Sequence, residues 1–435
     1  MKKNRLFIIF LICFSLLCAC GHENLQTSVD FTSKPQEKPA KDIILDESGK
    51  AVADIEKPES GDTIRIPVSD PPVEEEEPPV TVEGPEEAEN SFEGYVLGEE
   101  DISENGVYLK STAEEGVVRI VFAGDINFDD RYANMNTLRN RGNGIAGCID
   151  ASLLKRTNSA DIFMINNEFP YSKRGTPTPN KKFTFRAKPE TVSFLLDQGA
   201  DIVSLANNHA YDHGPDALLD TFDTLSEAGI PYVGAGHNID EAEKPVYFIA
   251  GGMKIAFVSA TQIERSLPPD TKEATETEPG VLRTLEPERF LSVIRTAEDN
   301  SDFVIVYVHW GSENVNKYEA AQTELAKVYE EAGADLIIGD HPHVLQGIEY
   351  INETPVFYSL GNYWFSSKTL DNCLVEAVIK DKKIESLQFI PCMQINCSAR
   401  ELPKGSADYD RVLNNMREWS TDNVNIDPDG YITRN

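Results

Sequence analysis

Short apolar runs alternate with amphipathic segments from about residue 117 onward, and this alternation is typical of an α/β fold. The apolar runs predict buried strands, several of which end directly before a polar residue. Apolar positions at helical spacing predict the helices between them. Strands are expected at residues 117–122, 162–165, 202–205, 304–308, 336–338 and 355–360, and helices at 189–198, 215–228, 287–299, 320–332 and 409–419.

Two pairs of apolar runs predict antiparallel hairpins within this alternation. Residues 246–250 and 254–259 flank the turn signal Gly251-Gly252, and residues 374–379 and 383–390 form a closing strand pair. The hairpins predict a mixed rather than purely parallel sheet. We therefore expect one folded α/β domain at residues 112–400, followed by a C-terminal helix and a loose polar tail at 401–435.

The first quarter of the chain does not follow this pattern. Residues 21–111 lack apolar periodicity and are rich in proline and glutamate, which predicts a disordered tether. Residues 1–20 resemble the signal peptide of a bacterial lipoprotein, with a basic start, an apolar run at 6–17 and a cysteine after Ala19. We expect a lipid anchor on Cys20; an ordinary secretory signal and an uncleaved anchor are the alternatives. The acidic runs of the tether could also bind a cation or a partner.

The net charge limits the possible binding partners, and the cysteine content limits the possible disulfides. The chain has 40 Lys and Arg against 73 Asp and Glu, a formal net charge of −33. Such a surface repels nucleic acid, and it repels anionic polymers unless divalent cations or a local basic patch intervene. The cysteines after the signal are too few and too scattered for a disulfide framework, so buried thiols are expected, with pairing of Cys392 and Cys397 left open.

Polar side chains of ligand type follow five of the predicted strands. Sites in open α/β sheets form beyond the carboxyl ends of strands, so these side chains are expected to converge. Carboxylate, amide and imidazole groups without thiolates suit a divalent ion such as Mn, Fe or Zn rather than a structural zinc–thiolate site. The candidates are Asp125, Glu168, Asn208 with His209, His309, and His341 with His343. Proline between the last two predicts an extended segment that presents both imidazoles on one side.

Each candidate also has an ordinary structural explanation. Asp125 could cap a helix, and Asn208 could occupy a turn. Asp212 could orient His209 or His213, or merely cap the following helix. Arg186 is a candidate contact for an anionic substrate, although it could equally belong to a structural ion pair. His213 and His237 lie in glycine-containing loops, where a supporting or surface role is favoured.

Several motifs between residues 117 and 365 together resemble the CapA family, proteins associated with poly-γ-glutamate capsules. They are Phe122-Ala-Gly-Asp-Ile126, Asn167-Glu168, Phe185-Arg-Ala187, Ser204-Leu-Ala-Asn-Asn-His-Ala-Tyr-Asp-His-Gly214, Gly234-Ala-Gly236, Val308-His-Trp-Gly311, Gly339-Asp-His-Pro-His-Val-Leu-Gln346 and Tyr358-Ser-Leu-Gly-Asn362. That family is similar in turn to calcineurin-like metallophosphoesterases. The resemblance implies a four-layer α-β-β-α sandwich with two sheets between helices.

The same resemblance implies roles for individual residues. Asp125, Glu168, Asn208, His309, His341 and His343 would bind one or two metal ions, and His209 would protonate the leaving group or stabilise charge on the substrate. Two positions depart from the phosphoesterase pattern: Asn127 stands where a histidine is normal, and Asn167-Glu168 stands where Gly-Asp is normal. Both departures weaken the expectation of a dinuclear centre and of phosphoester hydrolysis.

The lipoprotein-like signal and the family resemblance together imply a CapA-like protein anchored by lipid on the outer face of a bacterial cell membrane. It would take part in the synthesis, export or attachment of an anionic capsule polymer such as poly-γ-glutamate, by metal-assisted hydrolysis or transfer, with His209 and Asp212 as catalytic residues. Two alternatives remain: a non-catalytic scaffold or polymer-binding subunit of a membrane synthase, and an extracellular metal-dependent phosphoesterase. Expected partners are the membrane, the polymer and synthase subunits, and not nucleic acid.

Overall fold

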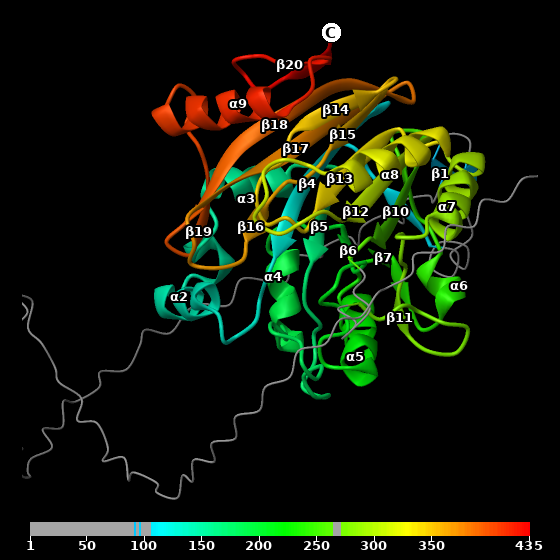
Figure 1. The fold of residues 1–435 in the computed structure, drawn as a ribbon, viewed down its shortest axis with the longest axis vertical. Helices are drawn as coiled ribbons and strands as arrows, with labels where there is room; N and C mark the ends of the chain where they lie inside the picture. The colour runs from blue at the N-terminus through cyan, green and yellow to red at the C-terminus, as the bar shows by residue number, and fades with distance from the viewer. Residues whose placement is uncertain (1–90, 93–94, 97–105, 264–270) are drawn as a thin grey trace, which may run out of the picture. The chain divides into compact units, whose positions relative to one another are not determined.

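The computed structural model describes residues 106–263 and 271–435, together with the backbone of β1 (Ser91–Phe92) and β2 (Tyr95–Val96). Two large sheets dominate this part of the chain (Figure 1). The first has seven strands in the order β14 (Ile348–Ile351), β15 (Thr354–Phe357), β13 (Leu336–Asp340), β12 (Phe303–His309), β10 (Met253–Thr261), β9 (Val246–Ala250) and β3 (Val107–Lys110).

The second sheet has eight strands, seven of them in one continuous order. These are β19 (Ser398–Glu401), β18 (Lys383–Ile395), β17 (Leu370–Lys380), β4 (Val117–Ile126), β5 (Ile162–Asn167), β6 (Ile202–Ser204) and β7 (Tyr232–Val233), while β16 (Asn362–Trp364) also pairs with β4. Strands β4 to β7 are parallel, as are β10, β12, β13 and β15. Both sheets are mixed, because antiparallel hairpins flank the parallel strands.

Helices cover the outer face of each sheet and complete four layers. Against the second sheet lie α2 (Ala133–Arg141), α3 (Ala151–Asn158), α4 (Ser193–Leu196) and α5 (Pro215–Glu227), with the 3-10 turns η1 (Gly144–Gly147) and η2 (Pro189–Val192). Helices α6 (Ile239–Ala242), α7 (Glu288–Asp299) and α8 (Ala320–Glu331) pack on the first. Figure 1 shows α7 and α8 beside β10 and β12. The predicted α-β-β-α fold class is confirmed.

The apolar runs follow from burial on both faces of each sheet. In β12, Ile305 and Tyr307 face the core between the sheets, whereas Val304, Val306 and Val308 pack against α7 and α8. Successive side chains of a strand point to opposite faces, so a strand between two apolar layers reads as a continuous apolar run. Strand β4 follows the same rule, with alternate residues in the central core and under the helices.

Several sequence predictions differ from the structure in detail. Strand β3 lies within the segment predicted as tether and pairs in parallel with β9, so the folded part begins before residue 111. The helix expected at 189–198 is shorter and divided between η2 and α4. Helix α9 (Ala407–Trp419) packs against the central core. The tail expected to be loose forms the hairpin of β20 (Val424–Ile426) and β21 (Ile432–Arg434).

Other predictions fall on parts of the chain that the structure does not describe. The signal peptide, the lipidation site Cys20 and most of the tether lie outside the described residues. Within the described ranges, every helix is too short or too polar to cross a membrane. Cys148, Cys373, Cys392 and Cys397 are all buried free thiols, so the described residues contain no Cys392–Cys397 bridge.

Candidate metal centre

The carboxyl ends of the parallel strands of both sheets meet at one place. In the second sheet, the register of β4 against β5 places Asp125 beside Asn166. Glu168 is the first residue after the end of β5. In the first sheet, the register of β12 against β13 places His309 beside Asp340. Because both sheets present this edge toward a common centre, their polar end residues form one buried cluster.

His309 lies at the middle of this cluster and is fully buried. Its Nδ1 is 2.8 Å from Asp340 Oδ1, and its Nε2 is 2.8 Å from Asn208 Oδ1. The same Nε2 is 3.0 Å from His341 Nδ1 and 3.7 Å from Glu168 Oε1. Burial lowers the pKa of His309 to about 3, so the imidazole is neutral at physiological pH. Neutral imidazole is the form that binds a metal ion.

Asp125 joins the second sheet to His343. Its Oδ1 accepts a hydrogen bond of 2.9 Å from Asn166 Nδ2, and its Oδ2 is 3.0 Å from His343 Nδ1. His343 Nδ1 is also 2.9 Å from Asn362 Oδ1. Burial opposes ionisation of both groups, but their hydrogen bond and mutual attraction prevail, lowering the pKa of Asp125 and raising the pKa of His343. The ionised Asp125 and the protonated His343 therefore stabilise each other's charge.

Glu168 provides the strongest sign that the cluster accommodates a cation. Among the described residues, both of its carboxylate oxygens are buried without a hydrogen-bond partner, and so is Oδ2 of Asp340. Burial, followed by repulsion from Asp125, raises the pKa of Glu168 well above its ordinary value, and the same two causes raise the pKa of Asp340. Buried carboxylates without partners are costly unless they are paired or bind a metal.

Three overlapping groups of side chains have the spacing of a metal site. In each group the ligand atoms lie within 4.8 Å of one another. Their carboxylate and imidazole donors fit a divalent ion of the Mn, Fe or Zn type. The groups are Glu168 with His309 and His341; Asp125 with His309 and Asp340; and Asp125 with Glu168 and His343. This buried cluster could therefore hold a metal ion.

His209 lies beside the cluster and is held by Asp212. Its Nδ1 is 2.6 Å from Asp212 Oδ2, which also accepts a 2.6 Å hydrogen bond from the backbone N–H of Phe185. The Phe185 ring packs on the imidazole, with centroids 4.0 Å apart. His209 Nε2 is 3.8 Å from Glu168 Oε1. The other Asp212 oxygen forms a 2.6 Å ion pair with Lys181.

His209 and Asp212 are both buried. Burial lowers the pKa of His209, although Asp212 opposes the effect. Burial would raise the pKa of Asp212, but His209 and Lys181 together hold it below its ordinary value. Asp212 is therefore an ionised carboxylate that fixes the orientation of the imidazole and stabilises its protonated form.

Backbone geometry at two places sets these positions. A Cβ atom on Gly124 would lie 1.9 Å from the carbonyl oxygen of Gly361, so only glycine allows β4 to approach this loop. His341 and His343 both have positive φ, 93° and 59°, and lie after the end of β13. The prediction of an extended His341-Pro342-His343 segment is wrong. The two imidazoles still reach the cluster, because the backbone bends at each histidine.

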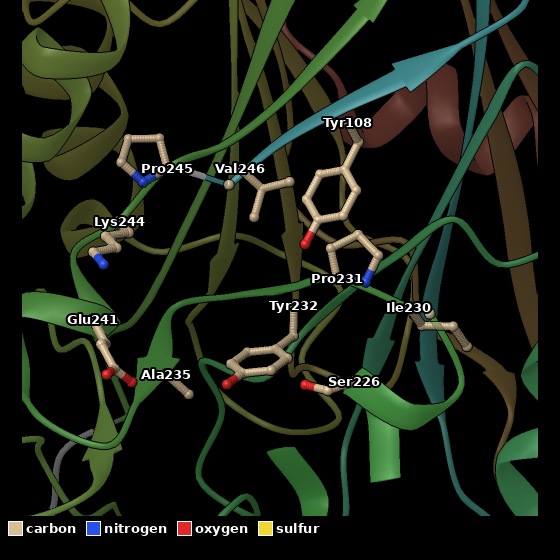
Figure 2. Close-up of a pocket in the computed structure, with 12 residues that line it drawn as sticks. Tyr108, Ser226, Ile230, Pro231, Tyr232, Ala235, Glu241, Lys244, Pro245 and Val246 are labelled. Carbon is tan, nitrogen blue, oxygen red and sulfur yellow. The ribbon is translucent and has the colours of Figure 1, made fainter. Parts of the chain in front are cut away.

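Two pockets differ in their position relative to this cluster. His341 lines one of about 440 Å³, together with Gln262, Ile263, Gly311, Ser312, Glu313 and Glu319. The other, of about 460 Å³, is bordered by the rings of Tyr108 and Tyr232 (Figure 2). Its lining comes from β3, α5, β7, β8 (Ala235–Gly236), α6 and β9 and their flanking loops, whereas the cluster lies at the ends of β4, β5, β6, β12 and β13. Of these two pockets, the first adjoins the candidate metal centre.

The remaining sequence candidates lie in different surroundings. The guanidinium of Arg186 donates a hydrogen bond of 3.1 Å to the carbonyl of Arg174, and its backbone N–H donates to Asp129. His213 is buried beside this loop, and the charge of Arg186 adds to the effect of burial in lowering the pKa of His213. His237 is on the surface, paired with Glu241 at 2.6 Å.

The structure also adds residues that the sequence prediction did not assign. Asp340 contacts His309, Asn166 contacts Asp125, and Lys181 reaches both Asp212 and the carbonyl oxygen of Asn208. The position of Asp340 directly before His341 was a usable signal, since it also ends a predicted strand. Lys181 had no such signal, because it lies in a loop far from any strand end.

Asn127, the position that departs from the phosphoesterase pattern, is turned toward its own loop. Its Oδ1 accepts a 2.7 Å hydrogen bond from the backbone N–H of Asp129, and its carbonyl accepts one from Asn134. Asn127 is fully buried, and its side-chain oxygen is thus already used within the segment that follows β4.

Comparison with known proteins identifies the family. The sequence profile of the bacterial capsule synthesis protein PGA_cap matches residues 119–367, more than half of the chain. This chain belongs to the PGA_cap family. The match contains Asp125, Glu168, Asn208, His209, Asp212, His309, Asp340, His341 and His343, and it agrees with the range in which the motifs resemble the CapA family.

Named members of the PGA_cap family are similar over different lengths. "PGA biosynthesis protein CapA" of Bacillus subtilis (strain 168) is 32% identical over 327 residues, covering 74% of this chain and 83% of that protein. "Capsule biosynthesis protein CapA" of Bacillus anthracis is 36% identical over 243 residues, covering 54% of this chain and 58% of that protein. The chain thus spans less than two thirds of the second relative.

Among solved structures, the protein TT1561 of Thermus thermophilus is similar over 61% of this chain and 99% of its own length. The sequence identity is 11% and the TM-score is 0.36.

Proposed function

We propose that this PGA_cap family member is a metal-dependent hydrolase or transferase that acts on an anionic capsule polymer, with poly-γ-glutamate as the first candidate. The observation that carries the proposal is the buried carboxylate of Glu168, which has no hydrogen-bond partner among the described residues and belongs to two of the three groups with metal-site spacing. The names of the Bacillus relatives supply the polymer and its pathway.

Asp125, Glu168, Asn208, His309, Asp340, His341 and His343 are the side chains that would hold the metal. A divalent ion held by these side chains would supply polarisation of the bond to be broken and activation of a water molecule. The polymer would enter beside His341 and His343, the latter having 16% of its side chain exposed. Burial of the other ligands excludes bulk water and strengthens every charge interaction in the site.

His209 would donate a proton to the leaving group. Asp212 accepts the Nδ1 hydrogen, so Nε2 is the atom that faces Glu168 and the reacting region. When Nε2 carries a proton, the Asp212 carboxylate stabilises the imidazolium, and donation of that proton neutralises the departing group. Lys181 limits the basicity of Asp212 and holds it in place.

The lipid anchor belongs to the same proposal. An acylated Cys20 would hold the folded domain outside the membrane at the end of the tether, where an exported polymer passes. A non-catalytic polymer-binding or scaffold role remains the second candidate, because the side-chain oxygen of Asn127 is hydrogen-bonded within its own loop.

Activity measurements on purified full-length protein separate these functions. The substrates are poly-γ-glutamate and an activated phosphodiester, each tested with added Mn²⁺ or Zn²⁺. We expect metal-dependent cleavage of poly-γ-glutamate, abolished by His341→Ala and strongly reduced by His209→Ala. The matched control is His237→Ala, since His237 lies on the surface. Equal activity of all three variants would overturn the catalytic proposal, and cleavage of the phosphodiester alone would assign a phosphoesterase.

A further inference from the structure

The loop beside His209 carries a concentration of positive charge in a strongly acidic chain. Residues 169–189 contain six Lys or Arg and no Asp or Glu, whereas the whole chain has a formal net charge of −33. We call this segment the basic loop; it runs from the end of β5 to the start of η2. Lys173, Lys182 and Lys188 are exposed. The loop is therefore a place where a polyanion meets attraction rather than repulsion.

Two side chains fix the basic loop against the candidate metal centre. Lys181 has only 6% of its side chain exposed, forms the ion pair with Asp212, and contacts the carbonyl oxygen of Asn208. Phe185 donates its backbone N–H to Asp212 and packs its ring on His209. The loop is thus tied at both points to the residues next to the reacting region, and whatever binds along it lies close to His209.

The residues that directly follow these two anchors are cations suited to binding carboxylates. Lys182 follows Lys181, and its ammonium lies 4.9 Å from the ring centroid of Phe183. Arg186 follows Phe185, and its guanidinium donates to a backbone carbonyl at 3.1 Å. Among the interactions that the structure describes, neither cation is paired with a carboxylate. Phe183, with 50% exposure, adds an apolar surface between them.

Other cations of the basic loop are paired with acids on the surface. Lys173 pairs with Glu190 at 3.0 Å, and Lys188 pairs with Asp130 at 2.6 Å. Exposed ion pairs are weak and are screened by salt. An incoming carboxylate can therefore take the place of the protein's own acid at small cost.

We propose that the basic loop is the docking segment for a polycarboxylate chain, with Lys182 and Arg186 as its principal contacts. The proposal rests on the proposed function for the identity of the polymer, and it adds the surface that recognises it. A guanidinium binds a carboxylate through two parallel hydrogen bonds. The exposed ring of Phe183 fits the methylene groups between successive carboxylates. The acidic remainder of the surface repels the polymer and so directs it to this loop.

Direct binding of fluorescent poly-γ-glutamate to the full-length protein in EDTA tests this proposal without any contribution from metal or turnover. The test variant is Lys182→Glu with Arg186→Glu. The control variant is Lys327→Glu with Lys383→Glu, which changes the net charge equally at exposed positions on α8 and β18. Thermal unfolding of both variants checks that the fold is intact.

We expect the test variant to bind the polymer at least about tenfold more weakly, the effect of losing one charge-assisted contact, and the control variant to bind within about twofold of the wild type. Binding should weaken steeply with added salt in the wild type. Equal losses in the two variants, or no loss in the test variant, would overturn the proposal. Because EDTA removes metal chemistry, failure here leaves the metal-dependent activity to be judged by its own assay.

Discussion

Replacing Glu168 with glutamine tests whether this buried carboxylate is adapted to a cation. Burial, and next the charge of Asp125, raises the pKa of Glu168 well above its usual value. An acid whose pKa is raised on folding destabilises the folded state as the pH climbs from its unfolded pKa, about 4.3, and the loss is complete above the folded pKa. The metal-free wild type should therefore be less stable at pH 8 than at pH 4.5 on account of this residue. Glu168→Gln removes that loss.

Without metal at pH 8, Glu168→Gln should be more stable than the wild type, and each kcal/mol of this difference raises the Tm of a large domain by roughly 2–4 °C. A metal present at 100 times its Kd stabilises the wild type by about 2.7 kcal/mol. An amide is a poorer ligand, so the order of stabilities should reverse when metal is added.

Thermal unfolding followed by circular dichroism, in EDTA and in Mn²⁺ or Zn²⁺, measures this reversal. Asp335→Asn is the matched control, because burial raises the pKa of Asp335 to about 6 but this residue precedes β13, at the other end of the strand from Asp340. Its effect should be the same with and without metal. A variant at Glu168 that is less stable than the wild type in EDTA at pH 8 would refute the reasoning.

Three further predictions concern the neighbours of Glu168. His209→Ala or Asp212→Asn should lower turnover by about 10²–10⁴-fold while the metal content, measured by mass spectrometry, stays unchanged. Burial lowers the pKa of His309 to about 3 in the folded state, so below pH 6.5 the unfolded chain binds a proton that the folded chain does not. The free energy of unfolding therefore falls as the pH is lowered below 6.5. The metal-free wild type should lose about 2 kcal/mol from this residue between pH 6.5 and 4.5, and His309→Asn should lose none of it in urea unfolding. Gly124→Ala should lower the free energy of unfolding by about 3 kcal/mol or more, because its Cβ would collide with the carbonyl of Gly361; an unchanged urea midpoint would contradict the close approach seen there.

The layers and most strands could be predicted, because a strand that is buried on both faces has a continuous run of apolar residues. Strands β4, β12 and β13 are continuous apolar runs between two packed layers, and their ends are marked by Asp125, His309 and Asp340. The short helices α2, α3 and α6 were missed, since none of them presents a long apolar face. Strand β3 was assigned to the tether, because its pairing with β9 depends on a partner far along the chain.

The convergence of the strand ends was predictable, but the contacts within the cluster were not. Parallel strands bring their carboxyl ends to one edge, which accounts for Asp125, Glu168 and His309. The positive φ values of His341 and His343 could not be read from the sequence, because they depend on how the loop packs against its neighbours. Lys181 was missed for the same reason: its partner Asp212 lies 31 positions further along the chain.

Anomalous diffraction from crystals grown with Mn²⁺ or Zn²⁺ tests the central claim most directly. We predict an anomalous peak among Asp125, Glu168 and His309, about 2.0–2.2 Å from at least one oxygen of Glu168 and one imidazole nitrogen. The same experiment on His309→Ala with His341→Ala should show the peak weakened or lost. Full-length protein in saturating metal with no peak in this cluster, or with its peak at other residues, would contradict the account.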